Sequence, residues 1–260
     1  MKNPYKALLK SGRPAFGLML TIPSPQLAQV VARAGFDWMM IDREHGPIDI
    51  GTCQQMIAAS QGTDCAPIVR IREIDPELAK PVLDAGAFGV IFPMVKTAEE
   101  AELAVASLRY PPQGVRGIGP IMASVRWGIT GAEYLKVANA ELMTVALIEH
   151  VEAVRNIKEI LAVKGIDVAQ IAPFDLSASL GRPGQIDHPE VKKAIATAER
   201  AILKSGVVLG GLGQTVENAK KMIARGYRAI LMTHDVGLIQ ATSAGMLGPL
   251  KGSKSTRSGY

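Results

Sequence analysis

Residues 16–42 read FGLMLTIPSPQLAQVVARAGFDWMMID, and this stretch holds a strand, a helix and a second strand in order. The runs 16–20 and 36–42 are almost continuously apolar, which is typical of strands buried on both faces of a parallel sheet. Between them, SPQLAQVVARAG has the apolar spacing of a helix that begins after Ser24 and ends at Gly35. The stretch therefore predicts one βα unit followed by a parallel strand.

The same unit recurs along the chain without a long linker. Helical patterns of the same kind cover residues 97–109, 188–206 and 215–226. Eight βα units predict an α/β fold, a single (β/α)8 TIM barrel, whose typical length of about 250 residues uses nearly the whole chain. We expect a barrel domain over residues 1–250 and a flexible basic tail over 251–260. The eight strand-like runs are residues 16–20, 36–42, 66–71, 89–94, 142–149, 167–173, 207–212 and 227–233.

The composition excludes several classes of protein. With 48% hydrophobic and 20% charged residues, the chain is too apolar for disorder, and it contains no uncharged run long enough to cross a membrane. The net charge of +5 is spread along the chain, which argues against a nucleic-acid partner. Cys53 and Cys65 lack the spacing of a disulfide or zinc site, and the first residues do not resemble a secretory signal, so we expect a cytoplasmic protein with no membrane partner.

The connection over residues 109–131 is longer than the others and rich in Pro and Gly. Such a segment is unusual as a simple link between a helix and a strand, and it suggests a functional loop over one end of the barrel. We expect Arg126 and Trp127 in this loop to help shape the substrate pocket.

Two acidic side chains follow neighbouring strands and form a candidate metal site. Glu149 ends the run 142–149, and Asp175 follows the run 167–173. Strands in a sheet lie about 4.8 Å apart, so the two carboxylates can share one ion, and hard oxygen ligands favour Mg²⁺ or Mn²⁺, with Co²⁺ as a further candidate. The alternative is a pair of solvated acids, with Asp175 capping a helix.

Three more residues at strand ends suggest acid–base and anion-binding chemistry. Arg70 can hold a carboxylate or carbonyl oxygen with two hydrogen bonds, or it can pair with Asp42 or Glu44. His45 lies three residues after Asp42, which suggests a general base oriented by a carboxylate, although a purely structural histidine fits as well. Lysine is missing from the strand ends except for Lys96, which argues against Schiff-base chemistry.

The sequence resembles the HpcH/HpaI family of metal-dependent pyruvate aldolases, which cleave 4-hydroxy-2-keto acids. The resemblance runs from AGFDWMMIDREHGP (34–47) through RYPPQGVRGIG (109–119) to APFDLSASLG (172–181). It implies that Glu149 and Asp175 bind the metal, that Arg70 binds the pyruvyl group, and that His45, supported by Asp42, is the base. It also implies a homo-hexamer, arranged as a trimer of dimers or a dimer of trimers, whose last barrel helix, about 235–247, is exchanged between subunits.

The substrate is expected to contact residues near the ends of the sixth and seventh strands. By the resemblance, the backbone of Ala172, Pro173 and Phe174 contacts the pyruvate carboxylate. Leu212, at the end of the run 207–212, is expected to line the same site, and the glycine-rich residues 210–214 are a weaker candidate for holding a phosphate.

Four residues depart from the family pattern and alter the predicted pocket. Leu147 replaces a usual Gln, Phe174 a usual small residue and Met19 a frequent Trp, whereas His234 appears in place of a Val-Gly-rich segment. The predicted metal ligands are kept while the pocket wall changes.

These residues predict a lyase that forms pyruvate and an aldehyde by way of a metal-stabilised enolate. The nearest alternative keeps the site and changes the reaction, giving an oxaloacetate decarboxylase or an enzyme that resembles macrophomate synthase. A second alternative is a barrel that binds a metabolite without turning it over. The sequence leaves open the aldehyde, the stereochemistry at C4 and the preferred metal.

Overall fold

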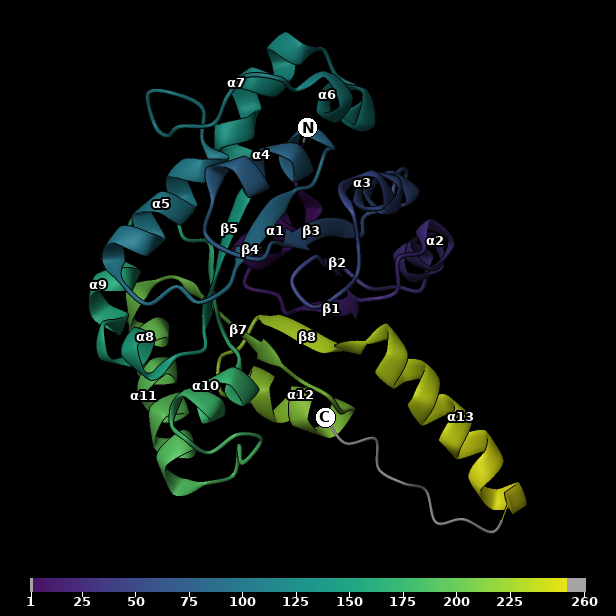
Figure 1. Ribbon diagram of the computed structural model, residues 1–260, viewed down its shortest axis with the longest axis vertical. Coiled ribbons are helices and arrows are strands. Elements are labelled where there is room, and N and C mark those ends of the chain that lie inside the picture. Colours follow the sequence, from purple (N-terminus) through teal and green to yellow (C-terminus); the bar gives the residue numbers. More distant parts are fainter. Residues whose placement is uncertain (1, 252–260) are drawn as a thin grey trace.

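The computed structural model describes residues 2–251 and contains a closed barrel of eight parallel strands in sequence order (Figure 1). Each strand pairs with its neighbours along the chain, and β1 pairs with β8 to close the barrel. The predicted TIM barrel is confirmed, and every predicted strand end lies within two residues of the observed one. The strands are β1 Ala15–Leu20, β2 Trp38–Asp42, β3 Ala66–Arg70, β4 Gly89–Phe92, β5 Met143–Ile148, β6 Val168–Ile171, β7 Val208–Leu212 and β8 Ala229–His234.

The helices surround the strands and begin where the sequence supplies capping groups. Side chains of Ser24, Thr97 and Thr215 accept hydrogen bonds from the first turns of α2, α5 and α12. The helices are α1 Pro4–Lys10, α2 Pro25–Arg33, α3 Ile50–Ala59, α4 Pro76–Asp84, α5 Ala98–Leu108, α6 Ile121–Trp127, α7 Gly131–Glu141, α8 Val151–Arg155, α9 Ile157–Ala162, α10 Pro173–Ser179, α11 Pro189–Ser205, α12 Val216–Ala224 and α13 Asp235–Lys251. In the described part of the chain, no helix combines the length and the apolar character needed to cross a membrane.

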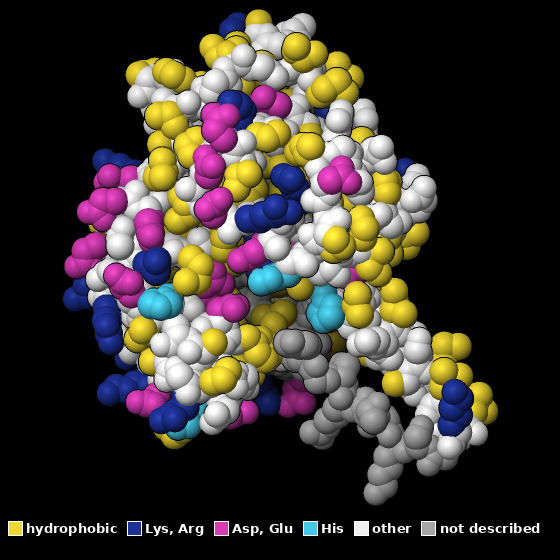
Figure 2. Space-filling view, in the orientation of Figure 1, with side chains coloured by type: hydrophobic (Ala, Val, Ile, Leu, Met, Phe, Trp, Pro, Cys, Tyr) yellow, Lys and Arg dark blue, Asp and Glu magenta, His cyan; other side chains and the backbone are white. Residues whose placement is uncertain are grey.

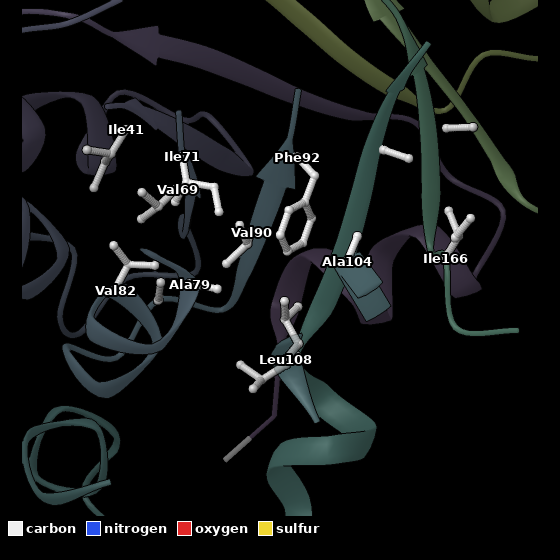
Figure 3. Close-up of a cluster of buried hydrophobic side chains, with 14 of the residues drawn as sticks. Ile41, Val69, Ile71, Ala79, Val82, Val90, Phe92, Ala104, Leu108 and Ile166 are labelled. Atoms are coloured by element: carbon white, nitrogen blue, oxygen red, sulfur yellow. The ribbon is translucent and has the colours of Figure 1, made fainter. Parts of the chain in front are cut away.

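Side chains alternate between two separate apolar clusters along each strand. Met39 and Ile41 of β2 belong to the cluster between barrel and helices, part of which is drawn in Figure 3, whereas Trp38 and Met40 belong to the cluster inside the barrel. Because successive side chains point to opposite faces, Asp42 shares the inward face of Trp38 and Met40. In the other strands, the same alternation decides which side chains near the carboxyl end point into the barrel mouth.

The long connection over residues 109–131 lies at the amino ends of the strands. Arg126 donates hydrogen bonds to Ile57 O (3.2 Å) and Ser60 Oγ (2.7 Å), at the end of α3, and Trp127 packs on Phe88, which precedes β4. In a βα barrel, helix ends and strand starts share one end of the barrel, opposite the mouth. Within this chain, the prediction that Arg126 and Trp127 shape the pocket is therefore wrong. Their contacts with α3 and Phe88 hold the segment at the amino ends of the strands, away from the pocket.

The last helix, α13, extends away from the barrel (Figure 1). It exposes five large apolar side chains to solvent, namely Leu238, Ile239, Met246, Leu247 and Leu250. The predicted helix over 235–247 is present and continues to Lys251, while the rest of the predicted basic tail lies outside the described residues. Exchange of this helix between subunits stays a prediction.

Asp235 joins the ends of β1 and β8, where the barrel closes. Its side chain is 2% exposed and accepts hydrogen bonds from the backbone N–H groups of Thr21 and Ile22 (both 2.8 Å) and from the Thr21 hydroxyl (2.7 Å). A buried carboxylate that accepts several N–H groups compensates for its own loss of hydration. Asp235 is therefore a structural residue of the barrel and also begins α13.

We expect the Asp235→Ala variant to lose at least about 2 kcal/mol of unfolding free energy, because buried N–H donors are left without an acceptor. Urea denaturation measures this loss. As a control, Asp187→Ala removes an exposed carboxylate that pairs with Lys192 at the surface and should leave the midpoint nearly unchanged. Equal midpoints for the two variants would show that Asp235 does not hold the barrel closed.

Candidate active site

Asp42 and Arg70 form a buried ion pair at the ends of β2 and β3. The two residues are partners in the strand register, and Arg70 donates from Nε to Asp42 Oδ1 and from Nη2 to Asp42 Oδ2, both at 2.8 Å. Asp42 is fully buried and Arg70 is 8% exposed. Burial acts to lower the pKa of Arg70, but Asp42 and neighbouring carboxylates outweigh it and raise that pKa, so the guanidinium stays charged.

Glu44 is a second acidic partner of Arg70. Its Oε2 lies 3.0 Å from Arg70 Nη1, in an ion pair that lacks the geometry of a hydrogen bond. Both partners named in the ion-pair alternative are therefore present at once. Two carboxylates hold the guanidinium in one orientation, with N–H groups to spare, since Arg carries five.

Glu149 follows β5 and is 3% exposed. Its Oε1 accepts a hydrogen bond of 2.6 Å from the backbone N–H of Met94, whose φ of 54° lies in the left-handed region. Within the described residues, Oε2 has no hydrogen-bond donor. Burial raises the pKa of Glu149 to about 7, and the charges of Asp175 and Glu44 add to this increase.

Asp175 lies in the first turn of α10 and is exposed, and its charge acts on both Glu149 and Glu44. The helix begins at Pro173 and its N-cap residue is Ala172, which has no side-chain hydrogen bond to offer, so the alternative in which Asp175 caps the helix is not realised. Among the described residues, no group of three or more His, Cys, Asp and Glu side chains is arranged to hold a metal ion. Two neighbouring carboxylates, one of them buried, are nevertheless suitable oxygen donors for a divalent ion.

His45 lies at the mouth with 66% of its side chain exposed. Its ring Nε2 is 3.8 Å from Glu44 Oε2, whereas Asp42 is reached only by the backbone N–H of His45, at 3.4 Å. The prediction that Asp42 orients the imidazole is therefore wrong. Asp42 is already occupied by Arg70, and the acid beside the ring is Glu44, which spacing along the chain did not single out.

The other predicted pocket residues surround these charged groups. Met19 is the register partner of His234, and its sulfur lies 3.7 Å from Arg70 Nη2. His234 accepts a hydrogen bond from Gly237 N–H at 3.2 Å. Leu147 lies inside the barrel, two residues before Glu149. Ala172, Pro173 and Phe174 form the start of α10, and Leu212 ends β7.

The chain thus carries four carboxylates and one guanidinium close together at the carboxyl ends of the strands. Figure 2 shows acidic, basic and histidine side chains gathered around a hollow near the middle of one face. Sequence reasoning named Glu44 as a partner of Arg70 but missed its place beside His45, and it also missed the Met94 amide. Glu44 and Met94 both lie in turns that follow strands, where the regular alternation of side chains no longer predicts which way a group points.

Comparison with known proteins agrees with this arrangement. The model of the HpcH/HpaI aldolase/citrate lyase family matches residues 15–241. A hydroxypyruvate/pyruvate aldolase of Cupriavidus necator is 39% identical over 91% of this chain and 88% of its own length. A 4-hydroxy-2-oxo-heptane-1,7-dioate aldolase of Escherichia coli is 38% identical over 98% and 97%.

A crystal structure of a family protein from Burkholderia cenocepacia superposes with a TM-score of 0.90 and 32% identity, covering 96% of this chain and all of the other. The matched region contains Asp42, Arg70, Glu149 and Asp175. This chain belongs to the HpcH/HpaI aldolase/citrate lyase family.

Proposed function

We propose that this chain is a class II pyruvate aldolase, a carbon–carbon lyase that reversibly cleaves a 4-hydroxy-2-keto acid to pyruvate and an aldehyde. The observation that carries the proposal is the grouping of Arg70, Glu149 and Asp175, which combines a cation for substrate oxygens with carboxylates for a metal. The names of the two aldolase relatives support the same reaction class.

Glu149 and Asp175 would hold the divalent metal ion. Their oxygens suit Mg²⁺ or Mn²⁺, and Co²⁺ is a further candidate. When bound, such an ion supplies a Lewis acid for the keto and carboxylate oxygens of the substrate. The Met94 N–H, donated to Oε1, fixes the Glu149 carboxylate with Oε2 left for the ion.

Arg70 would bind the keto oxygen, which gains negative charge as the carbon–carbon bond breaks. Because Asp42 and Glu44 already hold the guanidinium, its remaining N–H groups do not need to reorient during the reaction. Preorganised donors of this kind stabilise developing charge better than mobile ones. Asp42 is then a positioning residue and not a partner of the base.

His45 would move the proton. Its exposed imidazole, with the Glu44 carboxylate beside it, can accept the proton of the C4 hydroxyl through a water molecule during cleavage. In the condensation direction it returns that proton to the new hydroxyl. Glu44 takes the supporting role that the sequence assigned to Asp42.

The residues that depart from the family pattern would set the choice of aldehyde. Met19, Phe174 and His234 come from three different elements around the charged groups. Ala172, Pro173 and Leu212 complete the expected substrate contacts at the ends of β6 and β7. These neighbours change the size and polarity of the pocket without removing a charged group.

Assembly into a homo-hexamer is part of the same proposal. The apolar side chains that α13 exposes, such as Met246 at 70% and Leu250 at 82%, suit burial against a second copy of the chain. The partners of the active site would be small molecules, not a nucleic acid or membrane. A cytoplasmic location is supported by two buried, unpaired thiols, Cys53 and Cys65.

Pyruvate release tests the reaction. We expect protein treated with EDTA to release little pyruvate from 4-hydroxy-2-oxoheptanedioate and other 4-hydroxy-2-keto acids, and added Mg²⁺ or Mn²⁺ to restore release. Oxaloacetate is included because a site that stabilises an enolate also promotes decarboxylation. Faster turnover of oxaloacetate than of every hydroxy acid would favour the decarboxylase, and no turnover of any substrate would favour a binding protein.

Replacing Arg70 by Lys should lower kcat/KM by about 10²- to 10³-fold, because lysine keeps the charge but not the fork of donors. Arg70→Ala is less informative, since it leaves Asp42 buried without a partner and destabilises the fold. The matched control is Arg72→Ala, which removes an exposed arginine near the same end. Similar kcat/KM values for Arg70→Lys and the control would exclude Arg70 from substrate binding.

Glu149→Gln should abolish stabilisation by the metal. A saturating excess of Mn²⁺ should raise the melting temperature of the original chain by about 5 to 10 °C and leave the variant unchanged. Without metal at pH 8, the variant should melt higher than the original, because a neutral amide replaces a buried carboxylate whose pKa is about 7. The control, Glu152→Gln, alters a more exposed acid nearby. A full Mn²⁺ response in Glu149→Gln would contradict the assignment.

A further inference from the structure

Gln170 is a polar residue on the inner face of the barrel. It lies in β6 between Ala169 and Ile171, which both belong to the cluster between strands and helices. Val168, two residues earlier, belongs to the cluster inside the barrel. Alternation along the strand therefore turns Gln170 inward, one layer above Val168 and two residues before Ala172, the N-cap residue of α10.

The amide of Gln170 has no partner in the described part of the chain. The residue is 5% exposed, and its Oε1 is buried without a hydrogen bond. A buried amide without hydrogen bonds lowers the stability of a fold, so its presence calls for an explanation. Rotation about the last side-chain bond exchanges the amide oxygen and nitrogen, so this side chain can offer either an acceptor or a donor.

Neither neighbouring strand offers the amide a partner. On β5 the register partner is Leu147, an apolar residue two positions before Glu149. On β7 the register partner is Gly210, where an added Cβ would lie 3.2 Å from Gln170 Cβ. Gly210 is thus too close to its neighbours to carry a side chain without displacing them, and neither register partner gives Gln170 a polar group, directly below the start of the element that carries Asp175.

We propose that Gln170 binds substrate, its amide forming a hydrogen bond with an oxygen of the 2-keto acid held by Arg70 and the two metal-binding carboxylates. The inference rests on the proposed aldolase function. Its position inside the barrel, below the mouth, assigns it to the pyruvyl part of the substrate and not to the aldehyde part, which faces the exposed His45. Leu147 stands where the family resemblance expects a Gln, so the amide of this chain comes from the adjacent strand.

Gln170→Leu and Gln170→Met test the proposal. Both variants remove the amide, and Met keeps nearly the same length, so at least one is expected to fold. We expect the Kd for pyruvate, measured by calorimetry with Mg²⁺ present, and the KM for the 4-hydroxy-2-keto acid to rise at least tenfold. The melting temperature should stay the same or rise, because a polar group without partners is lost.

Thr144→Val is the matched control. Thr144 lies on the adjacent β5, its Oγ1 is also buried without a hydrogen bond, and it faces away from the barrel interior. Valine removes that hydroxyl at nearly constant volume. The control should keep pyruvate affinity and KM within twofold, since it alters an equally unpaired group that lies outside the pocket.

The double variant Leu147→Gln/Gln170→Leu moves the amide one strand over. If the amide serves the substrate, the double variant should recover at least part of the pyruvate affinity that Gln170→Leu loses. Pyruvate affinity and KM within twofold of the original in both Gln170→Leu and Gln170→Met would overturn the proposal. If the original chain cleaves no 2-keto acid, the proposed function fails, while the calorimetric comparison with pyruvate still decides whether Gln170 contributes to binding.

Discussion

The ion pair between Asp42 and Arg70 is the interaction on which the site depends. It fixes the Arg70 guanidinium between adjacent strands, where Asp42 and Glu44 both lie against it. Arg70 therefore offsets the charge of Glu149 only in part, and Asp175 adds further negative charge beside it. Burial is the largest cause of the raised pKa of Glu149, and the charges of Asp175 and Glu44 add to it, while the Met94 N–H and Arg70 act against it. Under the proposed function, a divalent ion would take the place of the proton in neutralising the Glu149 carboxylate.

The fold followed from the sequence because its signals are local and repeated. Continuous apolar runs mark buried parallel strands, and alternation within them assigns Asp42 and Arg70 to the inner face. The site residues at strand ends were predictable for the same reason. The partner of His45 was not, since Asp42 and Glu44 are both near in sequence and only the turn decides which carboxylate meets the ring.

The segment 109–131 shows that an easily recognised motif can serve the fold instead of the chemistry. Arg116 is almost completely buried, donates a hydrogen bond of 2.7 Å to Asp84, and lies over the rings of Tyr110 and Tyr134. These contacts fix the segment at the amino ends of the strands, far along the barrel from the mouth. A pattern of Arg, Tyr, Pro and Gly identifies the family, yet it gives no information on where the segment lies, because that depends on contacts distant in sequence.

The barrel interior has two layers. The lower layer is apolar and stabilises the fold, whereas the layer nearer the mouth contains buried polar side chains. Ile68, Val145 and Val168 fill the lower layer with close-packed side chains. Above them, Gln170 Oε1 is buried without a hydrogen bond, and the buried Glu149 carboxylate accepts a single one, from the Met94 N–H. Neither is explained by packing, since an apolar residue of similar size would stabilise the barrel more. Under the proposed function, a bound ion and substrate would supply contacts to these two side chains at the carboxyl ends of the strands, where a barrel forms its active site.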